Sequence, residues 1–392
     1  MSDASTQTIM WLKNFTVVGP EKVITGASLR IEDGIIAEIV PRVVPSGVDG
    51  TGLFLCPGFI DMHGDMIELE VEPRAGVDFP KNHAIAHLDA RMAACGFTTA
   101  YAAVSFCTNS FRGERRSREH SEGIIKALRE ARANCGIDHR IHARFDIDFP
   151  EAEDVLSDLL AAGLVDLVSL MDHTPGQGQY RDLERHIAKI ALRENITHEA
   201  AERHVMNKVE RAGPEADRWG RLQQFAEISR KAGIKLASHD DDTVRKVLMM
   251  MTFGSVISEF PITIEVARAA TEHGMFVAMG APNAMRGQSY SGNLSAREAH
   301  SVGFLHILAA DYHPASMLPA IIALAENDAD GLCGAVRLAS TNPAKALGLN
   351  DRGSLLPGNQ ADIAILDLRS NPRVVATLVR GQCVYSSGFL QL

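Results

Sequence analysis

The stretch Cys56-Pro57-Gly58-Phe59-Ile60-Asp61-Met62-His63-Gly64-Asp65 governs how the rest of the chain is interpreted. A Pro-Gly turn leads into a short apolar run, which ends in a histidine and a carboxylate two residues apart. Residues i and i+2 of a strand point to the same face, so His63 and Asp65 face one object together. An imidazole beside a carboxylate suits zinc, manganese or iron. The motif therefore predicts a metal site, provided that other segments supply further ligands.

Strand-like and helical patterns alternate from Pro57 onward. The apolar runs end near His63, Ser105, Ile147, His173, His239, Phe260, Ala281 and Asp311. Helical patterns between them include 84–94, 117–134, 151–162 and 215–231. Eight such units favour an α/β fold of the (β/α)8 TIM-like barrel type. A doubly wound open sheet is the competing architecture, and it is disfavoured because no Gly-x-Gly-x-x-Gly fingerprint opens the first unit.

Both ends of the chain carry strand patterns without a helical period. We expect 1–55 and 350–392 to pair in a small flanking β-sandwich, with 56–349 forming the barrel. The connection after the fourth barrel strand is long and rich in charged residues. It is expected to hold a helical insert around 180–232, either a lid or an oligomer contact.

Composition limits the classes of partner. The net charge of −10 argues against nucleic acid and anionic membranes, although an anionic small-molecule substrate can still bind a local basic pocket. The six cysteines form no Cys-x-x-Cys pair, which fits reduced thiols in the cytoplasm. No run approaches the roughly 18 apolar residues of a membrane helix. We expect a soluble, cytoplasmic homo-oligomer that contacts no membrane.

Polar residues collect where the predicted barrel strands end, which is where barrel enzymes place their catalytic groups. On strand three, His142, Arg144 and Asp146 share one face. The other strand ends carry Asp172-His173, His239-Asp240-Asp241-Asp242, Ser258-Glu259 and Asp311. Buried charges need partners, so this collection favours a metal centre over a hydrogen-bonded polar cluster.

These motifs resemble the amidohydrolase superfamily. The resemblance is carried by 57–63, by Asp311, and by 342–349 followed by 353–362, and it spans nearly the whole chain. It implies a distorted (β/α)8 barrel with a metal centre and a flanking β-sandwich. Segments 63–65, 171–177, 238–241, 279–283 and 286–293, with Asp311-Tyr312, are similar to one branch of the superfamily. That branch is the α-D-ribose 1-methylphosphonate 5-triphosphate diphosphatases of the carbon–phosphorus lyase pathway, which implies a hydrolase that releases pyrophosphate.

The resemblance also implies roles for single residues. The metal ligands are expected to be His63, Asp65, Asp146, His173 and His239. They are expected to hold one or two divalent ions, with zinc as the first choice and manganese or iron as alternatives. Asp146 stands where the branch has a glutamate, and it is expected to bridge. Asp311 is expected to be the general base that takes a proton from the attacking water.

An anionic substrate needs local cations and hydrogen-bond donors. The substrate-binding candidates are Arg74, Arg144, Asn283, Arg286 and Ser289. Arginine suits phosphate because its planar fork binds two oxygens at once. The cluster of Arg112, Arg115 and Arg116 is interpreted as solvated surface.

Two other functions stay open. One is a metal-dependent C–N hydrolase for an N-acyl or cyclic amide, using the same metals and Asp311 with a different pocket. The other is a catalytically inactive barrel kept for assembly in a multiprotein complex, which the intact set of ligands disfavours.

Overall fold

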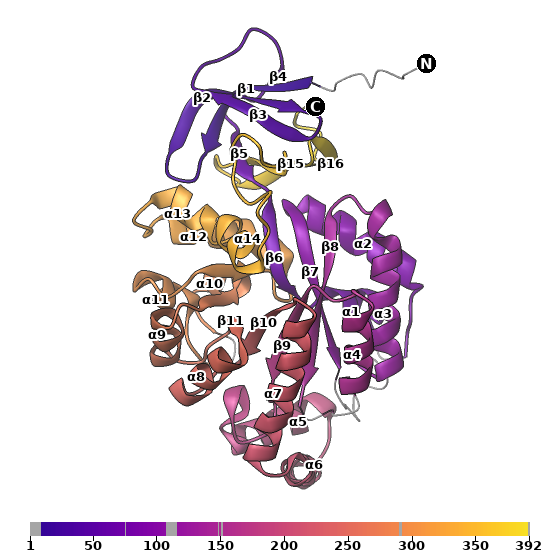
Figure 1. Cartoon of the computed structure of the whole chain (residues 1–392). Coiled ribbons are helices and arrows are strands. Elements are labelled where there is room, and N and C mark those ends of the chain that lie inside the picture. Colours follow the sequence, from indigo (N-terminus) through magenta and orange to yellow (C-terminus); the bar gives the residue numbers. More distant parts are fainter. Residues whose placement is uncertain are drawn as a thin grey trace.

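Two β-sheets organise the molecule, a parallel barrel and a flanking sheet (Figure 1). The computed structural model describes residues 9–74, 76–106, 116–147, 149, 152–289 and 292–390. The barrel strands are β6 (Phe59–Gly64), β7 (Phe97–Phe106), β8 (Asp138–Asp146), β9 (Leu167–Met171), β10 (Lys235–His239), β11 (Ser255–Glu259), β12 (Phe276–Gly280) and β13 (Ile307–Ala309). Each pairs in parallel with the next, and a parallel bridge between Gly64 and Asp311 joins the first strand to the end of the last. The predicted eight-stranded barrel is confirmed.

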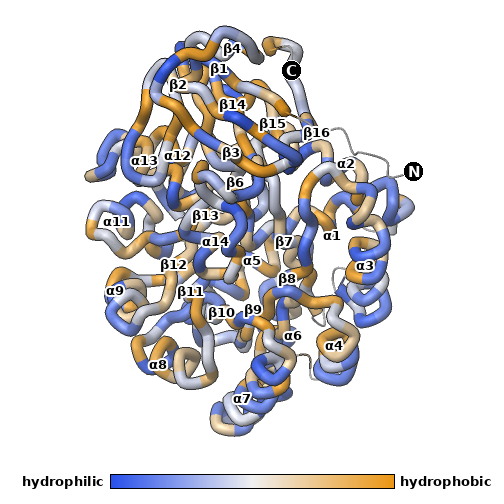
Figure 2. The backbone as a smooth tube through the Cα atoms, turned by 45° about the horizontal axis from the view of Figure 1, so that its top comes forward, coloured by the Kyte–Doolittle hydropathy of each residue, from blue (hydrophilic) through white to orange (hydrophobic). Residues whose placement is uncertain are grey.

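Helices cover the outside of the barrel and turn their apolar faces to the strands. They are α1 (Met66–Val71), α2 (Lys81–Ala94), α3 (Arg118–Ala131), α4 (Ala152–Ala161), α7 (Glu215–Lys231), α8 (Val244–Phe253), α9 (Ile264–Glu272), α10 (Ala281–Arg286), α11 (Ala296–Ser301), α12 (Met317–Ala325) and α13 (Gly331–Arg337). Helix α14 (Thr341–Leu347) differs, because it shares a separate apolar cluster with strand residues such as Ile60 and Ile257. Short 3-10 helices are η1 (Arg132–Asn134), η2 (Gly178–Tyr180) and η3 (Pro314–Ser316). Hydrophilic and hydrophobic residues alternate along α7 (Figure 2), as expected of a helix with one buried face.

The flanking sheet is built from both ends of the chain. Its strands are β1 (Ile9–Val18), β2 (Val23–Glu32), β3 (Ile35–Val40), β4 (Val48–Asp49), β5 (Phe54–Pro57), β14 (Ile363–Asp367), β15 (Arg373–Val379) and β16 (Gln382–Ser386). The ends of the chain meet where β14 pairs antiparallel with β5. Leu12, Leu55 and Ile365 belong to a separate apolar core under this sheet. Because β5 runs to Pro57, the sheet extends two residues past the predicted boundary.

Two inserted helices, α5 (Leu183–Glu194) and α6 (His198–Ala212), lie at the end of the molecule opposite the flanking sheet (Figure 1). They pack on each other around a small core that includes Ile187 and Val205. Helix α7 is different, because its Phe225 ring lies 4.2 Å from that of Phe145 on β8. The predicted insert at 180–232 thus contains two inserted helices and one barrel helix.

Candidate metal centre and active site

The seam between the first and last barrel strands fixes one side of the site. The Asp311 amide donates to the His63 carbonyl at 2.8 Å, and the Asp65 amide donates to the Asp311 carbonyl at 2.8 Å. Asp61, which is fully buried, accepts hydrogen bonds from the amides of His63 and Ala310 at 3.0 and 2.8 Å. Because the backbone is tied on both sides, the side chains of His63, Asp65 and Asp311 emerge at one end of the barrel.

Three strand ends turn sharply out of the barrel sheet. Asp240, Phe260 and Asp311 have φ angles of 49°, 55° and 56°, in a region that residues other than glycine rarely adopt. Such conformations cost on the order of 1–3 kcal/mol each and gather at functional sites. They follow β10, β11 and β13, where the chain leaves the sheet. Their position at this one rim is consistent with a site built there.

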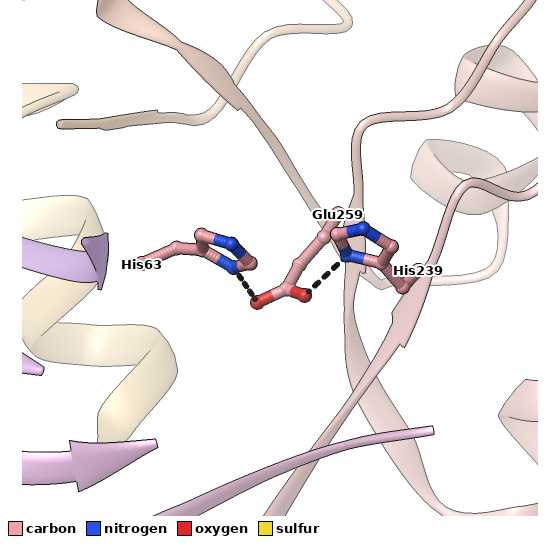
Figure 3. Close-up of side chains that lie close together, drawn as sticks. All are labelled: His63, His239 and Glu259. Carbon is pink, nitrogen blue, oxygen red and sulfur yellow. Dashed lines mark hydrogen bonds and ion pairs between the residues drawn. The ribbon is translucent and has the colours of Figure 1, made fainter. Parts of the chain in front are cut away.

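Three imidazoles meet at the rim, and each is held from behind by a buried carboxylate. Glu259 lies between two rings (Figure 3), with its Oε1 3.3 Å from His63 Nδ1 and its Oε2 3.1 Å from His239 Nδ1. Asp146 Oδ2 lies 2.6 Å from Nδ1 of His173. A carboxylate on one ring nitrogen fixes the tautomer and leaves the other nitrogen able to bind a metal. All three histidines have this arrangement.

The Nε2 atoms of the same histidines point toward other carboxylates. His63 Nε2 lies 3.4 Å from Asp65 Oδ1. His173 Nε2 and His239 Nε2 lie 3.5 and 3.6 Å from Asp240 Oδ2. One ligand atom from each of His173, His239 and Asp240 lies within 4.8 Å of the other two. Imidazole nitrogen and carboxylate oxygen are the donors that zinc and related divalent ions prefer, so the geometry suits such an ion.

Unpaired polar atoms test this fit. Among the described residues, the buried side-chain atoms that lack a hydrogen-bond partner include His173 Nε2 and Asp240 Oδ2. Leaving such atoms unsatisfied is costly, and most buried polar atoms in proteins are paired. His173 Nε2 and Asp240 Oδ2 belong to the candidate ligand group. The residues present therefore fit a divalent cation.

The carboxylates set the protonation of the imidazoles. Burial disfavours the charged form of His63, but Glu259 and Asp65 outweigh it and raise the pKa of His63 to about 10. Burial also opposes the charged form of His173, yet Asp146 raises its pKa well above the ordinary value. The carboxyls of Glu259 and Asp146 have lowered pKa values despite burial, chiefly through neighbouring histidines. The site attracts positive charge, as a cation site must.

The pKa of the Asp311 carboxyl shifts in the opposite direction to those of Glu259 and Asp146. Burial is the main cause that raises its pKa to about 7, and the nearby Asp65 carboxylate adds to the effect. Asp65 itself has a pKa below the usual range, because Arg144 and His63 overcome the effect of burial. Two neighbouring carboxyls with pKa values pushed apart are typical of an acid–base pair in an active site.

A cavity of about 310 Å³ opens over these groups. Its lining includes the predicted site residues His63, Asp65, Arg144, His239, Asn283, Arg286, Ser289 and Asp311. Asp240, which was not among the predicted site residues, also lines it. Asp146 and His173 are not among the lining residues, although His173 Nε2 lies 3.5 Å from Oδ2 of Asp240, which is. Arg74 is exposed and lies outside the lining.

The substrate-binding candidates differ in what their side chains already do. Asn283 donates from Nδ2 to the Leu294 carbonyl at 3.1 Å and accepts at Oδ1 from the Ala296 amide at 3.1 Å. It therefore connects α10 to the backbone at Leu294 and Ala296. Arg286 at the end of α10 is exposed and makes no side-chain hydrogen bond or ion pair within the described residues. Arg286 is thus available to an anionic ligand.

The arginine cluster after β7 lies only partly within the described residues. Arg112 and Arg115 fall outside them. Arg116 is partly buried, and its Nε donates to Glu68 at 2.7 Å. Glu68 also accepts from the amide of Ser105 at 2.9 Å. Arg116 is therefore bound to a buried carboxylate beside the site and is no solvated surface residue.

Three residues of the site were missing from the sequence-based ligand set. Glu259 is fully buried and backs two histidines, and it also accepts a short hydrogen bond from Ser169. His142 lies under the site, 3.6 Å from Glu259, and burial lowers its pKa to about 3. Asp240 completes the group with His173 and His239. The available signal was a carboxylate at the end of strand six and a second one directly after His239.

The closed barrel, the sheet made of both chain ends and the rim of histidines and carboxylates define a class of protein. A family model described as "Amidohydrolase family" matches residues 332–385. The chain is also 36% identical over 371 residues to the α-D-ribose 1-methylphosphonate 5-triphosphate diphosphatase of Escherichia coli (strain K12), covering 92% of this chain and 96% of that protein. The chain therefore belongs to the amidohydrolase superfamily and is a hydrolase.

Solved structures confirm the fold. The N-acetyl-D-glucosamine-6-phosphate deacetylase of Mycobacterium smegmatis, as a D267A mutant, is 18% identical, with a TM-score of 0.63 over 97% of this chain and 100% of that one. The dihydropyrimidinase of Brevibacillus agri NCHU1002 is 14% identical, with a TM-score of 0.58 over 97% and 95%. At these identities the likeness shows the fold alone. Within the described residues, no helix has the length and apolar character needed to cross a membrane.

Proposed function

We propose that the protein hydrolyses α-D-ribose 1-methylphosphonate 5-triphosphate and releases pyrophosphate. The Escherichia coli relative supports the substrate, since it matches over nearly its whole length. The observation that carries the proposal is the cavity, whose lining brings together Asp311, the histidine and carboxylate side chains of the rim, and Arg286. Its volume of about 310 Å³ is that of a small-molecule pocket.

The Nε2 atoms of His173 and His239, with the Asp240 carboxylate, would hold the divalent ion. When bound, such an ion supplies Lewis acidity and eases the ionisation of water at neutral pH. Asp146 and Glu259 orient the two rings through their Nδ1 atoms. Both carboxylates are buried, so their hydrogen bonds are not weakened by solvent. Zinc stays our first expectation, with manganese or iron as alternatives.

Asp311 takes the proton of the attacking water. Its carboxyl lines the cavity, and its backbone is fixed to His63 and Asp65 on the opposite side of the seam. A general base works best with a pKa near the working pH, and burial brings that of Asp311 to about 7. The proton that leaves the water is then passed to the departing pyrophosphate or to solvent.

The cavity lining carries carboxylates and cations in similar number. The carboxylates are Asp65, Asp240 and Asp311, and the cations are Arg144, Arg286 and the His63 imidazole, whose pKa is raised to about 10. The carboxylates partly offset the attraction of these cations for a triphosphate. A bound divalent ion would add positive charge, and Arg286 can bind phosphate oxygens in bidentate fashion. This distribution supports the proposed anionic small-molecule substrate.

The test is product analysis with purified protein loaded with zinc or manganese. The substrate is a ribosyl 5-triphosphate, supplied with and without the 1-methylphosphonate group, and the products are identified by phosphorus NMR. We expect pyrophosphate and a ribosyl 5-phosphate, with no release by Asp311→Asn. Hydrolysis of N-acyl or cyclic amides without pyrophosphate would favour the C–N hydrolase, and inactivity on both classes would favour an inactive barrel.

A further inference from the structure

An aspartate, a cysteine and a histidine gather at the end of the barrel opposite the rim. Asp89 belongs to α2, Cys135 directly follows η1, and His139 is the second residue of β8. One ligand atom from each lies within 4.8 Å of the other two. Strand β8 ends at the rim with Asp146, and about seven residues of strand, or about 23 Å, lie between its two ends. The group is therefore separate from the site described above.

The Asp89 carboxylate is fixed in place by the segment that carries the other two residues. Its Oδ2 accepts from the Gly136 amide at 2.8 Å, and its Oδ1 accepts from the Ile137 amide at 3.1 Å. The same Oδ1 lies 3.1 Å from His139 Nε2. Burial disfavours the charged form of Asp89, but the contacts with His139 and the two amides hold its pKa below the ordinary value. Carboxylates that bind metals are typically held by hydrogen bonds of this kind.

Hydrogen bonding within the group leaves His139 incomplete. Its side chain is fully buried, its Nε2 faces Asp89, and its Nδ1 has no hydrogen-bond partner within the described residues. An unpaired buried polar atom is costly, and in native structures it calls for a specific explanation such as an ion or a functional role. Imidazole is also the commonest metal ligand in proteins. The contact between His139 and Asp89 therefore does not account for this buried ring by itself.

Cys135 supplies the donor atom that sets the class of metal. Its thiol is partly buried and donates a long hydrogen bond to the Ala131 carbonyl at 3.5 Å. Burial raises the pKa of the thiol to about 11, and the Asp89 carboxylate adds to the effect, so an entering ion displaces the thiol proton to solvent as the sulfur–metal bond forms. Thiolate, imidazole and carboxylate together suit zinc or cobalt, whereas magnesium and calcium prefer oxygen ligands.

We infer that Asp89, Cys135 and His139 form a zinc site, distinct from the rim centre, that clamps α2 to the start of β8. The ligands would be the Cys135 thiolate, one ring nitrogen of His139 and a carboxylate oxygen of Asp89. Asp89 and Cys135 are partly exposed, so water can complete a tetrahedral set. The inference does not rest on the proposed function.

The position of the group fits a stabilising role. Residues at this end of a barrel serve stability, while catalysis takes place at the other end. Helix α2 lies beside β16 of the flanking sheet (Figures 1 and 2). The backbone at Gly136 approaches the same strand closely, because a Cβ there would lie 3.2 Å from the Val384 Cβ. A zinc ion here would therefore fasten the barrel where the flanking sheet packs on it.

The experiment uses cobalt in place of zinc, because a cobalt–thiolate bond absorbs in the near ultraviolet and the predicted rim ligands offer only nitrogen and oxygen. Full-length protein stripped of metal is loaded with cobalt, dialysed against metal-free buffer and examined by absorption spectroscopy. We expect one cobalt–thiolate bond per chain in the wild type and loss of the band in Cys135→Ser. The matched control is Cys95→Ser, which removes another partly buried thiol directly after α2 and should keep the band.

Cadmium-113 NMR gives an independent readout that needs no variant, because its chemical shift separates an ion bound to sulfur from one bound only to nitrogen and oxygen. The wild type should show a sulfur-bound ion. Zinc should also raise the melting temperature of the wild type more than that of Cys135→Ser, since an ion that binds only the folded chain stabilises it. Should Cys135→Ser fail to fold, Cys135→Ala tests the same point.

Three results would overturn the zinc site. They are a wild type without a sulfur-bound ion, a thiolate band that survives in folded Cys135→Ser, and a band that is lost in folded Cys95→Ser. Pyrophosphate release is measured on the same preparations. Release without a sulfur-bound ion overturns this inference alone, and a sulfur-bound ion without release counts against the proposed function alone.

Discussion

Replacing Glu259 by glutamine tests whether a single buried carboxylate orients the metal-binding histidines. The substitution keeps the volume of the side chain and removes its charge. In the wild type one oxygen faces His63 Nδ1 at 3.3 Å and the other faces His239 Nδ1 at 3.1 Å. The amide of a glutamine can present an oxygen to only one of the two rings. The other ring would face an N–H group, which favours the wrong tautomer.

The loss of metal affinity depends on how many metal-binding histidines have Glu259 as their hydrogen-bond partner. Loss of such a partner typically lowers metal affinity by about 10- to 100-fold. If His239 is the only one of the two rings that binds an ion, the loss in Glu259→Gln should be about tenfold to 100-fold, or roughly 1.4–2.7 kcal/mol. If His63 also binds an ion, two ligands lose their partner and the loss should exceed that range.

Zinc affinity would be measured by competition with a chromophoric chelator, with circular dichroism to verify folding. The matched control is Glu68→Gln. Glu68 is also buried, at 3% exposure, and binds Arg116 and the Ser105 amide without contacting a site histidine. The control should keep wild-type zinc affinity. A folded Glu259→Gln protein with unchanged affinity would refute the assignment of Glu259 as the partner of the metal-binding rings.

Three further predictions concern other side chains. The pKa of Asp311 is raised from 3.8 to about 7 in the folded state, so ionisation of this carboxyl lowers folding stability increasingly as pH rises from about 4 to 7. In EDTA, Asp311→Asn should therefore raise the melting temperature more at pH 8 than at pH 5. An equal gain at both pH values would contradict this. Lys246 donates to the backbone carbonyls of His239 and Asp240 at 2.7 and 3.2 Å. Lys246→Met should weaken zinc binding about tenfold, with partial rescue by Lys246→Arg. If Lys246 only fills space, Lys246→Met should leave zinc affinity unchanged. Arg286→Met should raise KM for the triphosphate by at least about tenfold and change kcat less, because it removes a charged contact at the cavity mouth; steady-state kinetics would expose the reverse pattern.

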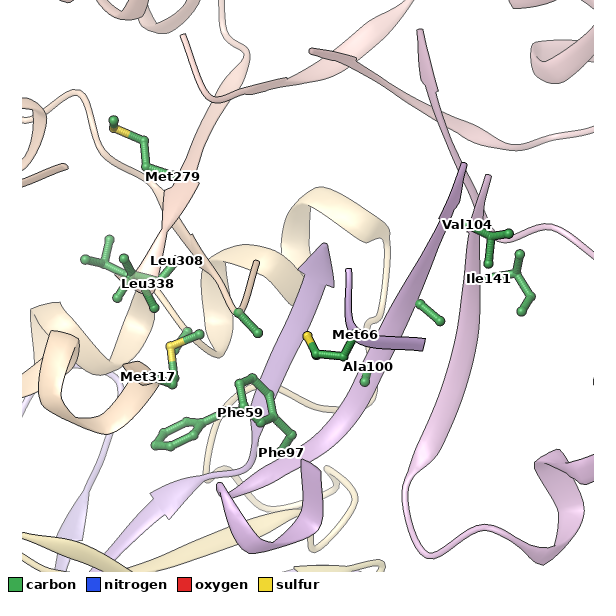
Figure 4. Close-up of a cluster of buried hydrophobic side chains, with 14 of the residues drawn as sticks. Phe59, Met66, Phe97, Ala100, Val104, Ile141, Met279, Leu308, Met317 and Leu338 are labelled. Carbon is green, nitrogen blue, oxygen red and sulfur yellow. The ribbon is translucent and has the colours of Figure 1, made fainter. Parts of the chain in front are cut away.

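The sequence alone was sufficient for the barrel. Its strands are nearly continuous apolar runs, as strands buried on both faces must be, and Phe59, Phe97, Val104 and Leu308 lie in the core between the strands and their helices (Figure 4). Such patterns are local, so they can be read without the fold. The pair His63 and Asp65 followed from the two-residue period of a strand, and the motifs of the family extended it to the other strand ends.

Only the tertiary structure decided which atoms meet. Glu259 touches rings on two other strands, and Asp146 stands behind His173, where the sequence suggested a bridging ligand. The side-chain amide of Asn283 donates a hydrogen bond to the backbone carbonyl of Leu294. The Arg144 guanidinium donates to the Asp65 carboxylate. The physical reason is that strand periodicity gives the face of a side chain, whereas its partner depends on how the barrel closes and on the positive φ angles at the strand ends. Those contacts join residues far apart in the chain, and no local pattern encodes them.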